Sequence, residues 1–254
     1  MYVIVNKFQS LIWSLLGAIL LICQSCQSED PEVLDPSIFG YDYYPIAIGK
    51  YWMYQTDSIL YSLKSTVVVD TSRSFIREEV RDSFRDATNQ LIYRLDVYHS
   101  RDSSQGWDLS GNFYVEANSL ALNKRENGLT FVRLVFPAQR GTSWNGNVYI
   151  HPRTTILIGG ESLEPFENWY YIYDYINKSD TILGRVYSNT CQVTEVDDEN
   201  IIQKRYSIAK YAKGIGLIYK EQWLLDTQNT DTAIPFSKRA QKGMILTQRL
   251  LYSN

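Results

Sequence analysis

The sequence contains few of the residues that mark enzymes and metal proteins. It has 254 residues, yet only two histidines, three cysteines and seven prolines. Neither His99 nor His151 has a second metal ligand two or four residues away, and the HExxH, GxSxG, GxxxxGK and GxGxxG patterns are absent. We therefore expect no metal ion and no cofactor, and the sequence names no catalytic residue.

Long apolar runs are also missing. Residues 11–22 are apolar apart from Ser14 and Gly17, and they follow a head whose only charge is Lys7. A membrane-spanning helix needs about 20 apolar residues, so this run is too short to span a bilayer. A cationic head, a short apolar core and a polar segment after it are typical of a secretory signal peptide, which we place at residues 1–25.

Cys26 follows the small residue Ser25 four positions after the apolar core. This arrangement resembles the signal of bacterial lipoproteins, which implies that Cys26 becomes the acylated first residue of the mature chain. The membrane lipid is then a partner, because acyl chains contribute about 0.8 kcal/mol per buried methylene. The next four residues resemble the surface-export tag of Bacteroidota lipoproteins: Gln27, Ser28, Glu29 and Asp30. Residues 26–40 also have the composition of a flexible acidic tether.

The charge of the mature chain excludes one class of partner. The signal peptide contains only Lys7 of the 25 basic residues and none of the 28 acidic ones, so its removal changes the net charge from −3 to −4. Nucleic acid requires a basic surface and is not an expected partner. Cys191 is the thiol that remains after acylation, so stability must come from packing without an intrachain disulfide.

A period of two dominates the mature chain. In residues 91–98 the apolar side chains alternate with Arg94 and Asp96, as in a half-buried strand. The same pattern recurs in residues 50–63, 65–70, 129–136, 168–176, 191–196, 201–211, 217–225 and 244–252. Short turns rich in Gly, Asn and Asp separate these segments, among them residues 177–180, and such turns join antiparallel neighbours. The acidic residues 195–200 predict a solvated hairpin tip.

These patterns predict a mainly β domain at residues 41–254. We expect a single antiparallel, strongly curved sheet or open barrel of about 9–12 strands, since several strands are long enough to coil around one core. A two-sheet sandwich is the alternative. Residues 75–84 fit both a helix, through a spacing of four, and a strand, and we favour the strand because the segment lies between two others.

One motif occurs twice. Tyr44-Pro45 and Phe136-Pro137 each begin an aromatic-Pro-x3-Gly-x2-Trp sequence with identical spacing. In each copy the glycine can adopt positive φ and the tryptophan can begin an extended segment. We expect two corners of a sheet, each held by a buried tryptophan.

Three segments carry a family resemblance. YYPIAIGKYWMYQTDSI, RLVFPAQRGTSWNGN and YAKGIGLIYKE resemble sequences in a group of Bacteroidota lipoproteins without an assigned function. The resemblance runs from about residue 41 to the end of the chain. It implies architecture rather than activity. The lipoprotein signal and the acidic tag together predict a lipid-anchored location at the outer membrane, on the cell surface, with the periplasmic leaflet as the alternative.

The richest aromatic segment is NWYYIYDYI, which is an aromatic binding face if it is open to a ligand and part of the core if it is not. Flat rings with a polar edge suit the apolar faces of sugars, whereas tyrosines in a sheet also serve as cross-strand pairs. The residues on the candidate face are Trp169, Tyr171, Tyr173 and Tyr175.

Three Asp-Ser/Thr-apolar triplets resemble the O-glycosylation acceptor of exported Bacteroidota proteins. Their hydroxyl residues are Ser58, Thr181 and Thr232.

Three functions remain open at this point. The first is a non-catalytic lipoprotein that binds a glycan or another envelope protein. The second is a periplasm-facing carrier or chaperone, which an unfilled apolar concave face would favour. The third is a hydrolase, which would need two close carboxylates from distant strands.

Overall fold

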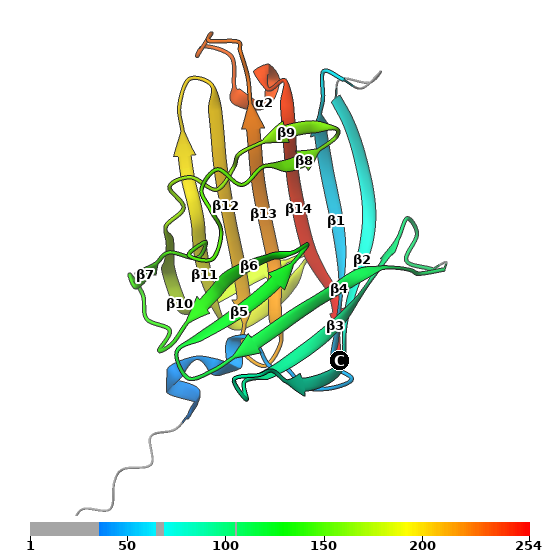
Figure 1. Ribbon diagram of the computed structural model, residues 1–254, viewed down its shortest axis with the longest axis vertical. Coiled ribbons are helices and arrows are strands. Elements are labelled where there is room, and N and C mark those ends of the chain that lie inside the picture. Colours follow the sequence, from blue (N-terminus) through cyan, green and yellow to red (C-terminus); the bar gives the residue numbers. More distant parts are fainter. Residues whose placement is uncertain (1–35, 65–68, 105) are drawn as a thin grey trace, which may run out of the picture. The chain divides into compact units, whose positions relative to one another are not determined.

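The computed structural model describes residues 36–254 apart from 65–68 and 105. Within these residues, twelve strands form one antiparallel sheet in the order β6-β5-β4-β3-β2-β1-β14-β13-β12-β11-β10-β7, and β8 pairs with β9 in a second sheet (Figure 1). The strands are β1 (Tyr51–Tyr61), β2 (Val69–Arg85), β3 (Leu91–Ser100), β4 (Asp108–Ala117), β5 (Ala121–Glu126), β6 (Leu129–Val135), β7 (Ser143–Trp144), β8 (Ile156–Ile158), β9 (Glu161–Leu163), β10 (Tyr171–Ile182), β11 (Arg185–Glu199), β12 (Gln203–Ala212), β13 (Gly216–Asp226) and β14 (Lys242–Ser253). The short helices are η1 (Pro36–Phe39), η2 (Tyr41–Tyr43) and α2 (Phe236–Arg239).

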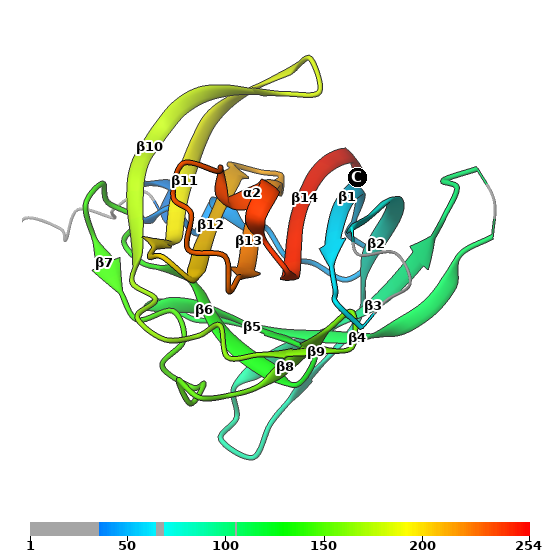
Figure 2. The same cartoon turned by 90° about the horizontal axis from the view of Figure 1, so that it is seen from above.

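The large sheet curls into a nearly closed barrel, which Figure 2 shows from above. Its two edges meet through the segment that follows β6. β7 pairs with β10, while the Val132 amide of β6 donates to the Gly146 carbonyl at 2.8 Å. Bridging the edges satisfies backbone groups that would otherwise be free to pair with another chain. The prediction of a strongly curved antiparallel sheet is confirmed.

Residues 75–84 form part of β2, so the prediction of a strand is confirmed. The register between β2 and β3 shifts between Val80 and Asp82. A bulge of this kind inserts an extra residue and turns later side chains to the opposite face. Val80 therefore packs in the core, whereas Phe84 lies on the outer face with 45% of its surface exposed.

The core fills the inside of the barrel with aromatic and aliphatic side chains. Trp52, Tyr54, Tyr171 and Tyr173 are each at most 1% exposed. They belong to one cluster that draws on β1, β2, β3, β4, β5, β6, β10, β11, β12, β13 and β14. A second, smaller cluster lies where Phe236 and Ala240 at helix α2 pack with Ile245.

The two copies of the repeated motif form the same turn. The amides of Lys50 and Thr142, each just after the glycine, donate to the carbonyls three residues earlier, at 3.0 and 3.1 Å. Gly49 and Gly141 have φ of 85° and 83°, a conformation that only glycine adopts without strain. In both copies the tryptophan indole N–H donates to a backbone carbonyl of another element. The two predicted turns are confirmed, but only Trp52 is the expected buried tryptophan, since Trp144 is partly buried.

The hairpin of β8 and β9 packs against the end of β1. The Ser62 hydroxyl donates to the Gly159 carbonyl at 3.0 Å, and a Cβ on Gly159 would come within 3.0 Å of Leu60. The alternation along β1 makes Leu60 share the inner face with Trp52 and Tyr54. The hairpin therefore covers part of the concave side of the sheet (Figure 1).

Packing at the N-terminal side begins within the last residues of the predicted tether. The Ala138 amide donates to the Phe39 carbonyl at 2.9 Å. Gly40 has φ of 82°, and a Cβ there would come within 2.8 Å of the Ala138 Cβ. Residues 39–40 thus pack against the folded domain, and residues 26–35 of the predicted tether lie outside the described residues.

Two predicted details are wrong. Residues 177–180 are not a turn, because β10 continues to Ile182 and the hairpin tip is at Leu183 and Gly184, both with positive φ. Residues 195–200 are not all at a solvated tip, because Glu195 is 1% exposed and faces the inside of the barrel. In both cases long strands carry polar residues that favour turns when they are considered locally.

Candidate functional site

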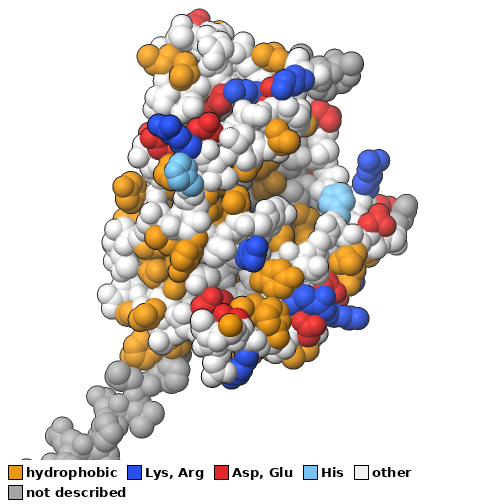
Figure 3. Space-filling model, viewed as in Figure 1, with side chains coloured by type: hydrophobic (Ala, Val, Ile, Leu, Met, Phe, Trp, Pro, Cys, Tyr) orange, Lys and Arg blue, Asp and Glu red, His pale blue; other side chains and the backbone are white. Residues whose placement is uncertain are grey.

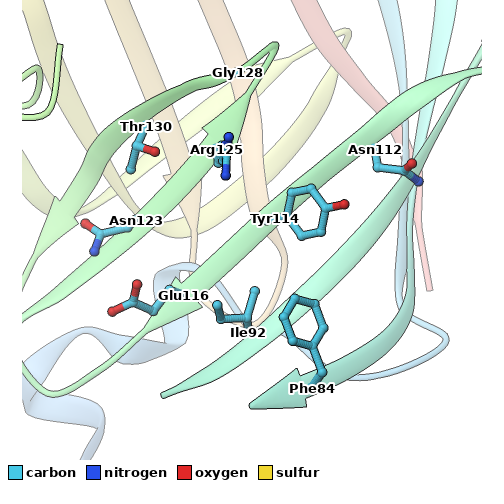
Figure 4. A pocket seen from close by; sticks show the side chains of 9 residues that line it. All are labelled: Phe84, Ile92, Asn112, Tyr114, Glu116, Asn123, Arg125, Gly128 and Thr130. Carbon is cyan, nitrogen blue, oxygen red and sulfur yellow. The ribbon is translucent and has the colours of Figure 1, made fainter. Parts of the chain in front are cut away.

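A depression of about 630 Å³ lies on the outer face of the wall formed by β2 to β6. We call it the outer-face patch. In Figure 4, Phe84, Ile92 and Tyr114 lie beside polar side chains contributed by β4, β5 and β6. Its lining residues are Phe84, Ile92, Asn112, Tyr114, Glu116, Asn123, Arg125, Gly128 and Thr130.

Strand alternation brings these residues together. Tyr114 pairs directly with Arg125 across β4 and β5, and Glu116 pairs with Asn123. Because successive side chains point to opposite faces, these four share the outer surface while Val115 between them is buried. The bulge in β2 adds Phe84, whose ring meets the edge of Tyr114 at a centroid distance of 6.3 Å.

The two asparagines of the patch differ in their hydrogen bonding. Asn112 donates to the Asp96 carboxylate at 2.8 Å. The side-chain oxygen of Asn123, in contrast, is buried and has no hydrogen-bond partner in the described part of the chain. Buried polar atoms normally have a partner, so this oxygen is an unsatisfied acceptor beneath the surface of the patch.

The chemistry of the patch combines ring faces with hydrogen-bonding groups. Figure 3 shows hydrophobic side chains beside acidic and basic ones on this side of the molecule. A site with apolar and aromatic walls and a few converging polar groups is typical of small-molecule recognition. Rings such as Phe84 and Tyr114 can stack on the apolar faces of sugars, while amides and carboxylates bond to hydroxyls.

A second polar group of residues lies inside the barrel, and we call it the lumen cluster. The Lys124 ammonium contacts Glu78 at 2.7 Å and Glu126 at 3.0 Å. Arg133 contacts Glu126 and Glu195, both at 2.8 Å. The six members come from β2, β5, β6, β11 and β13: Glu78, Lys124, Glu126, Arg133, Glu195 and Lys220.

The ion pairs favour the charged forms of Glu126 and Lys124. Burial by itself raises the pKa of the Glu126 carboxyl, but the charges of Arg133 and Lys124 outweigh it and hold that pKa well below its usual range. Burial likewise acts to lower the pKa of Lys124, yet Glu126 and Glu78 raise it above its ordinary value. For Lys220 burial prevails, aided by the charge of Arg133, and its pKa is lowered.

The concave face does not have the property expected of an apolar carrier. Core side chains fill most of it, and the remaining cavity of about 240 Å³ is lined in part by Glu78, Lys124 and Arg133. The carboxylates that a hydrolase would need are present as Glu78, Glu126 and Glu195, and each is paired with a cation.

The predicted aromatic face belongs to the core. Trp169, Tyr171 and Tyr173 are at most 3% exposed, and the Tyr173 hydroxyl donates to the Val135 carbonyl. Tyr175 is half-buried and donates to Asp180. The structure therefore corrects the binding-face interpretation in favour of core packing, because β10 lies against the segment that closes the barrel.

The remaining predicted sites lie apart from one another. Ser58 is in the middle of β1 and within 2.9 Å of the Ser72 hydroxyl, whereas Thr181 and Thr232 are exposed near a hairpin tip and in a loop. Cys191 is a buried free thiol whose pKa burial raises. The signal peptide, Cys26 and the export tag Gln27, Ser28, Glu29 and Asp30 lie outside the described residues.

Sequence reasoning missed both the outer-face patch and the lumen cluster. The reason is that β4 and β5 do not alternate between apolar and polar residues. In ALNKRE of β5, Lys124 and Glu126 face inward and Arg125 faces outward, so both faces carry charge. A strand with charge on both faces loses the pattern by which strands are recognised. The turn sequence Asn127-Gly128 predicts the hairpin between β5 and β6, but it does not show which side chains of β5 face the lumen.

The described residues contain neither a candidate metal site nor a candidate membrane-spanning helix. No group of three or more His, Cys, Asp or Glu side chains in this part of the chain could hold a metal ion. No helix within it is long and apolar enough to cross a membrane.

Comparisons with known proteins give similar structures but no family. No protein-family model matches the chain, and no curated protein matches its sequence. One similar solved structure is a Bacteroides fragilis protein, proposed by its description to be exported, with a YmcC-like fold. It has 9% sequence identity and a TM-score of 0.39 over 83% of this chain and 98% of that one. Another is a proposed lipoprotein of Parabacteroides distasonis, with 12% identity and a TM-score of 0.34 over 84% and 98% of the two chains.

Proposed function

We propose that this protein is a non-catalytic lipoprotein, anchored to the outer membrane through an acylated Cys26, that binds a glycan of the cell envelope. The binding surface is the outer-face patch. The resemblance of residues 27–30 to the surface-export tag supports a location on the cell surface.

The observation that carries the proposal is the composition of the outer-face patch. Phe84 supplies an exposed ring and Tyr114 a half-buried one, while Asn123, Arg125 and Glu116 supply donors and acceptors around them. The core of a protein-binding interface is generally depleted in charge, whereas this depression is lined by a carboxylate, a guanidinium and amides. This mixture favours a hydroxylated ligand over an envelope protein.

Replacement of Tyr114 by alanine is expected to weaken glycan binding about tenfold. The change removes a ring that a sugar would cover, and burial of such a ring contributes about 1.5 kcal/mol or more, which is a factor of ten in the dissociation constant. The measurement is a glycan array to find a ligand, followed by titration calorimetry with the best one. Phe84→Ala should have a similar effect.

The matched control is Tyr170→Ala, which removes another tyrosine that is 69% exposed and lies outside the outer-face patch. Its affinity should equal that of the wild type. Equal affinities for Tyr114→Ala and Tyr170→Ala, or a weaker effect at position 114 than at 170, would contradict the assignment of the patch.

Replacement of Cys26 by alanine is expected to move the protein from the membrane fraction to the soluble fraction. Without the acylated cysteine the chain loses its anchor, since two or more acyl chains are needed for stable attachment. The measurement is cell fractionation followed by immunoblotting, together with protease shaving of intact cells against a periplasmic marker.

Replacing the acidic residues of the export tag tests whether the domain lies on the cell surface or in the periplasm. Glu29→Ala/Asp30→Ala should remain membrane-bound and become protected from protease on intact cells, while the wild type is cleaved. A wild type that is protected would show that the domain faces the periplasm, and the proposed surface location would be wrong.

A further inference from the structure

The inside of the barrel contains a cavity that the outer-face patch does not use. Its volume is about 240 Å³, and its walls come from β2, β3, β4, β5, β6, β12, β13 and β14. Gln222 and Gln248 in its wall are half-buried rather than fully enclosed, so the cavity is reached from solvent. A water molecule needs about 10–15 Å³ of such a volume, so the cavity has room for a small organic molecule.

Hydrogen-bonding groups on one wall of the cavity are unused. Lys220 on β13 is the direct cross-strand partner of Gln248 on β14, and Gln222 follows two residues later on the same inner face. Within the described residues, neither glutamine side chain makes a hydrogen bond to protein. The Lys220 ammonium has its nearest carboxylate oxygen, on Glu195, at 3.4 Å.

Apolar side chains lie beside the glutamines and on neighbouring strands, since Leu246 is the direct cross-strand partner of Gln222. Ile76, Val97, Phe113, Met244 and Leu246 line the same cavity. A ligand that fits this lining must present both hydroxyls or other small polar groups and carbon atoms. Two free amides, each able to donate and to accept, suit hydroxyl groups in particular.

The charge of the cavity excludes a charged ligand. The lumen cluster contains three carboxylates and three cations, and every one of them has an opposite charge within 3.4 Å. An additional buried charge would lose its hydration without gaining an unpaired counter-ion. A neutral molecule avoids this cost.

We propose that the barrel lumen binds one neutral monosaccharide. A single sugar ring matches the volume, its hydroxyls match Gln222, Gln248 and Lys220, and its carbon-bound hydrogens match the apolar side chains. The inference deepens the proposed function and rests on it for the class of ligand, but it places a second subsite inside the barrel, separate from Tyr114 and Phe84.

The test is titration calorimetry on the full chain, in a detergent without a sugar headgroup. The probes are D-glucose, D-galactose, D-mannose, L-fucose and N-acetyl-D-glucosamine, with D-glucuronate as a charged ring of similar size. We expect at least one neutral sugar to bind with a dissociation constant in the millimolar range or below. Glucuronate should bind at least tenfold more weakly than glucose or not at all.

Two replacements locate the binding. Gln222→Leu and Gln248→Leu keep the approximate volume and remove the polar groups, and each should weaken binding of the neutral sugar at least tenfold. The control Gln228→Leu changes an exposed glutamine outside the cavity and should leave affinity unchanged. Melting curves for all three variants identify any that fail to fold, and for those the alanine replacement at the same position serves as the second variant.

The outcomes separate this inference from the proposed function. The lumen subsite is supported if Gln222→Leu and Gln248→Leu lose binding of the neutral sugar while Tyr114→Ala binds it like the wild type. Loss in Tyr114→Ala with wild-type affinity in the lumen variants overturns it and leaves the outer-face patch as the sugar site. Absence of binding by every neutral sugar, or equal binding of glucuronate, also overturns the lumen subsite and leaves glycan binding at Tyr114 to its own test.

Discussion

Replacing Lys124 by methionine is expected to lower the free energy of unfolding by about 3–5 kcal/mol, because removal of one partner from a buried ion pair leaves the other charge uncompensated. Glu78 is 4% exposed, and the two hydrogen bonds that the structure gives its carboxylate both come from the Lys124 ammonium. Methionine has nearly the same shape as lysine, so loss of packing contributes little. Guanidinium denaturation followed by far-UV circular dichroism measures the change.

The matched control is Lys204→Met, the same change in an ion pair with Glu199 whose side chains are 22% and 44% exposed. An exposed pair of this kind contributes about 0–1 kcal/mol. The double replacement Lys124→Met/Glu78→Leu should recover most of the loss, because it removes the stranded carboxylate. A loss below about 1 kcal/mol in Lys124→Met, or no recovery in the double variant, would contradict the contacts described for the lumen cluster.

Replacing Trp52 by alanine is expected to cost about 3–5 kcal/mol, which is typical of a large aromatic side chain removed from a core. Trp52 is fully buried, and its indole N–H donates to the Ile215 carbonyl at 2.5 Å. Its ring also packs against Tyr44 at a centroid distance of 5.4 Å. The replacement leaves a cavity and a carbonyl without its donor, and thermal and chemical unfolding measure the loss.

The second copy of the repeated motif supplies the comparison for this prediction. Trp144 occupies the equivalent position and also bonds to a backbone carbonyl, but it is only partly buried. Trp144→Ala should therefore cost clearly less than Trp52→Ala. Equal losses would show that the two corners contribute alike and that burial does not set the difference.

The lumen cluster and the outer-face patch arise from the same strands. On β5, Lys124 points into the barrel while Asn123 and Arg125 point outward. On β4, Phe113 points into the barrel and Tyr114 points outward. Each strand of the wall thus presents one face to the lumen and the other to the surface. Two binding surfaces can therefore lie back to back across a single sheet.

Much of the fold follows from the sequence. Alternation identifies β1, β3, β6, β12, β13 and β14, whose residues pack one face against the core. The aromatic-Pro-x3-Gly-x2-Trp motif predicts both glycine turns, because positive φ is a local property of the chain. The candidate sites do not follow in the same way, because β4 and β5 carry polar residues on both faces and no local rule identifies them as strands.

The sequence by itself determined the local features: the repeated turns, the alternating strands and the absence of metal and nucleotide motifs. It also predicts the acylation site at Cys26. Only the tertiary structure decided that Trp169, Tyr171 and Tyr173 are core residues, that Glu195 lies inside the barrel and that Phe84 meets Tyr114 on the outside. These outcomes depend on sheet closure, a bulge in β2 and contacts between residues far apart in the chain. Such contacts leave no local pattern, because the partners that decide whether a side chain is buried are chosen by the fold.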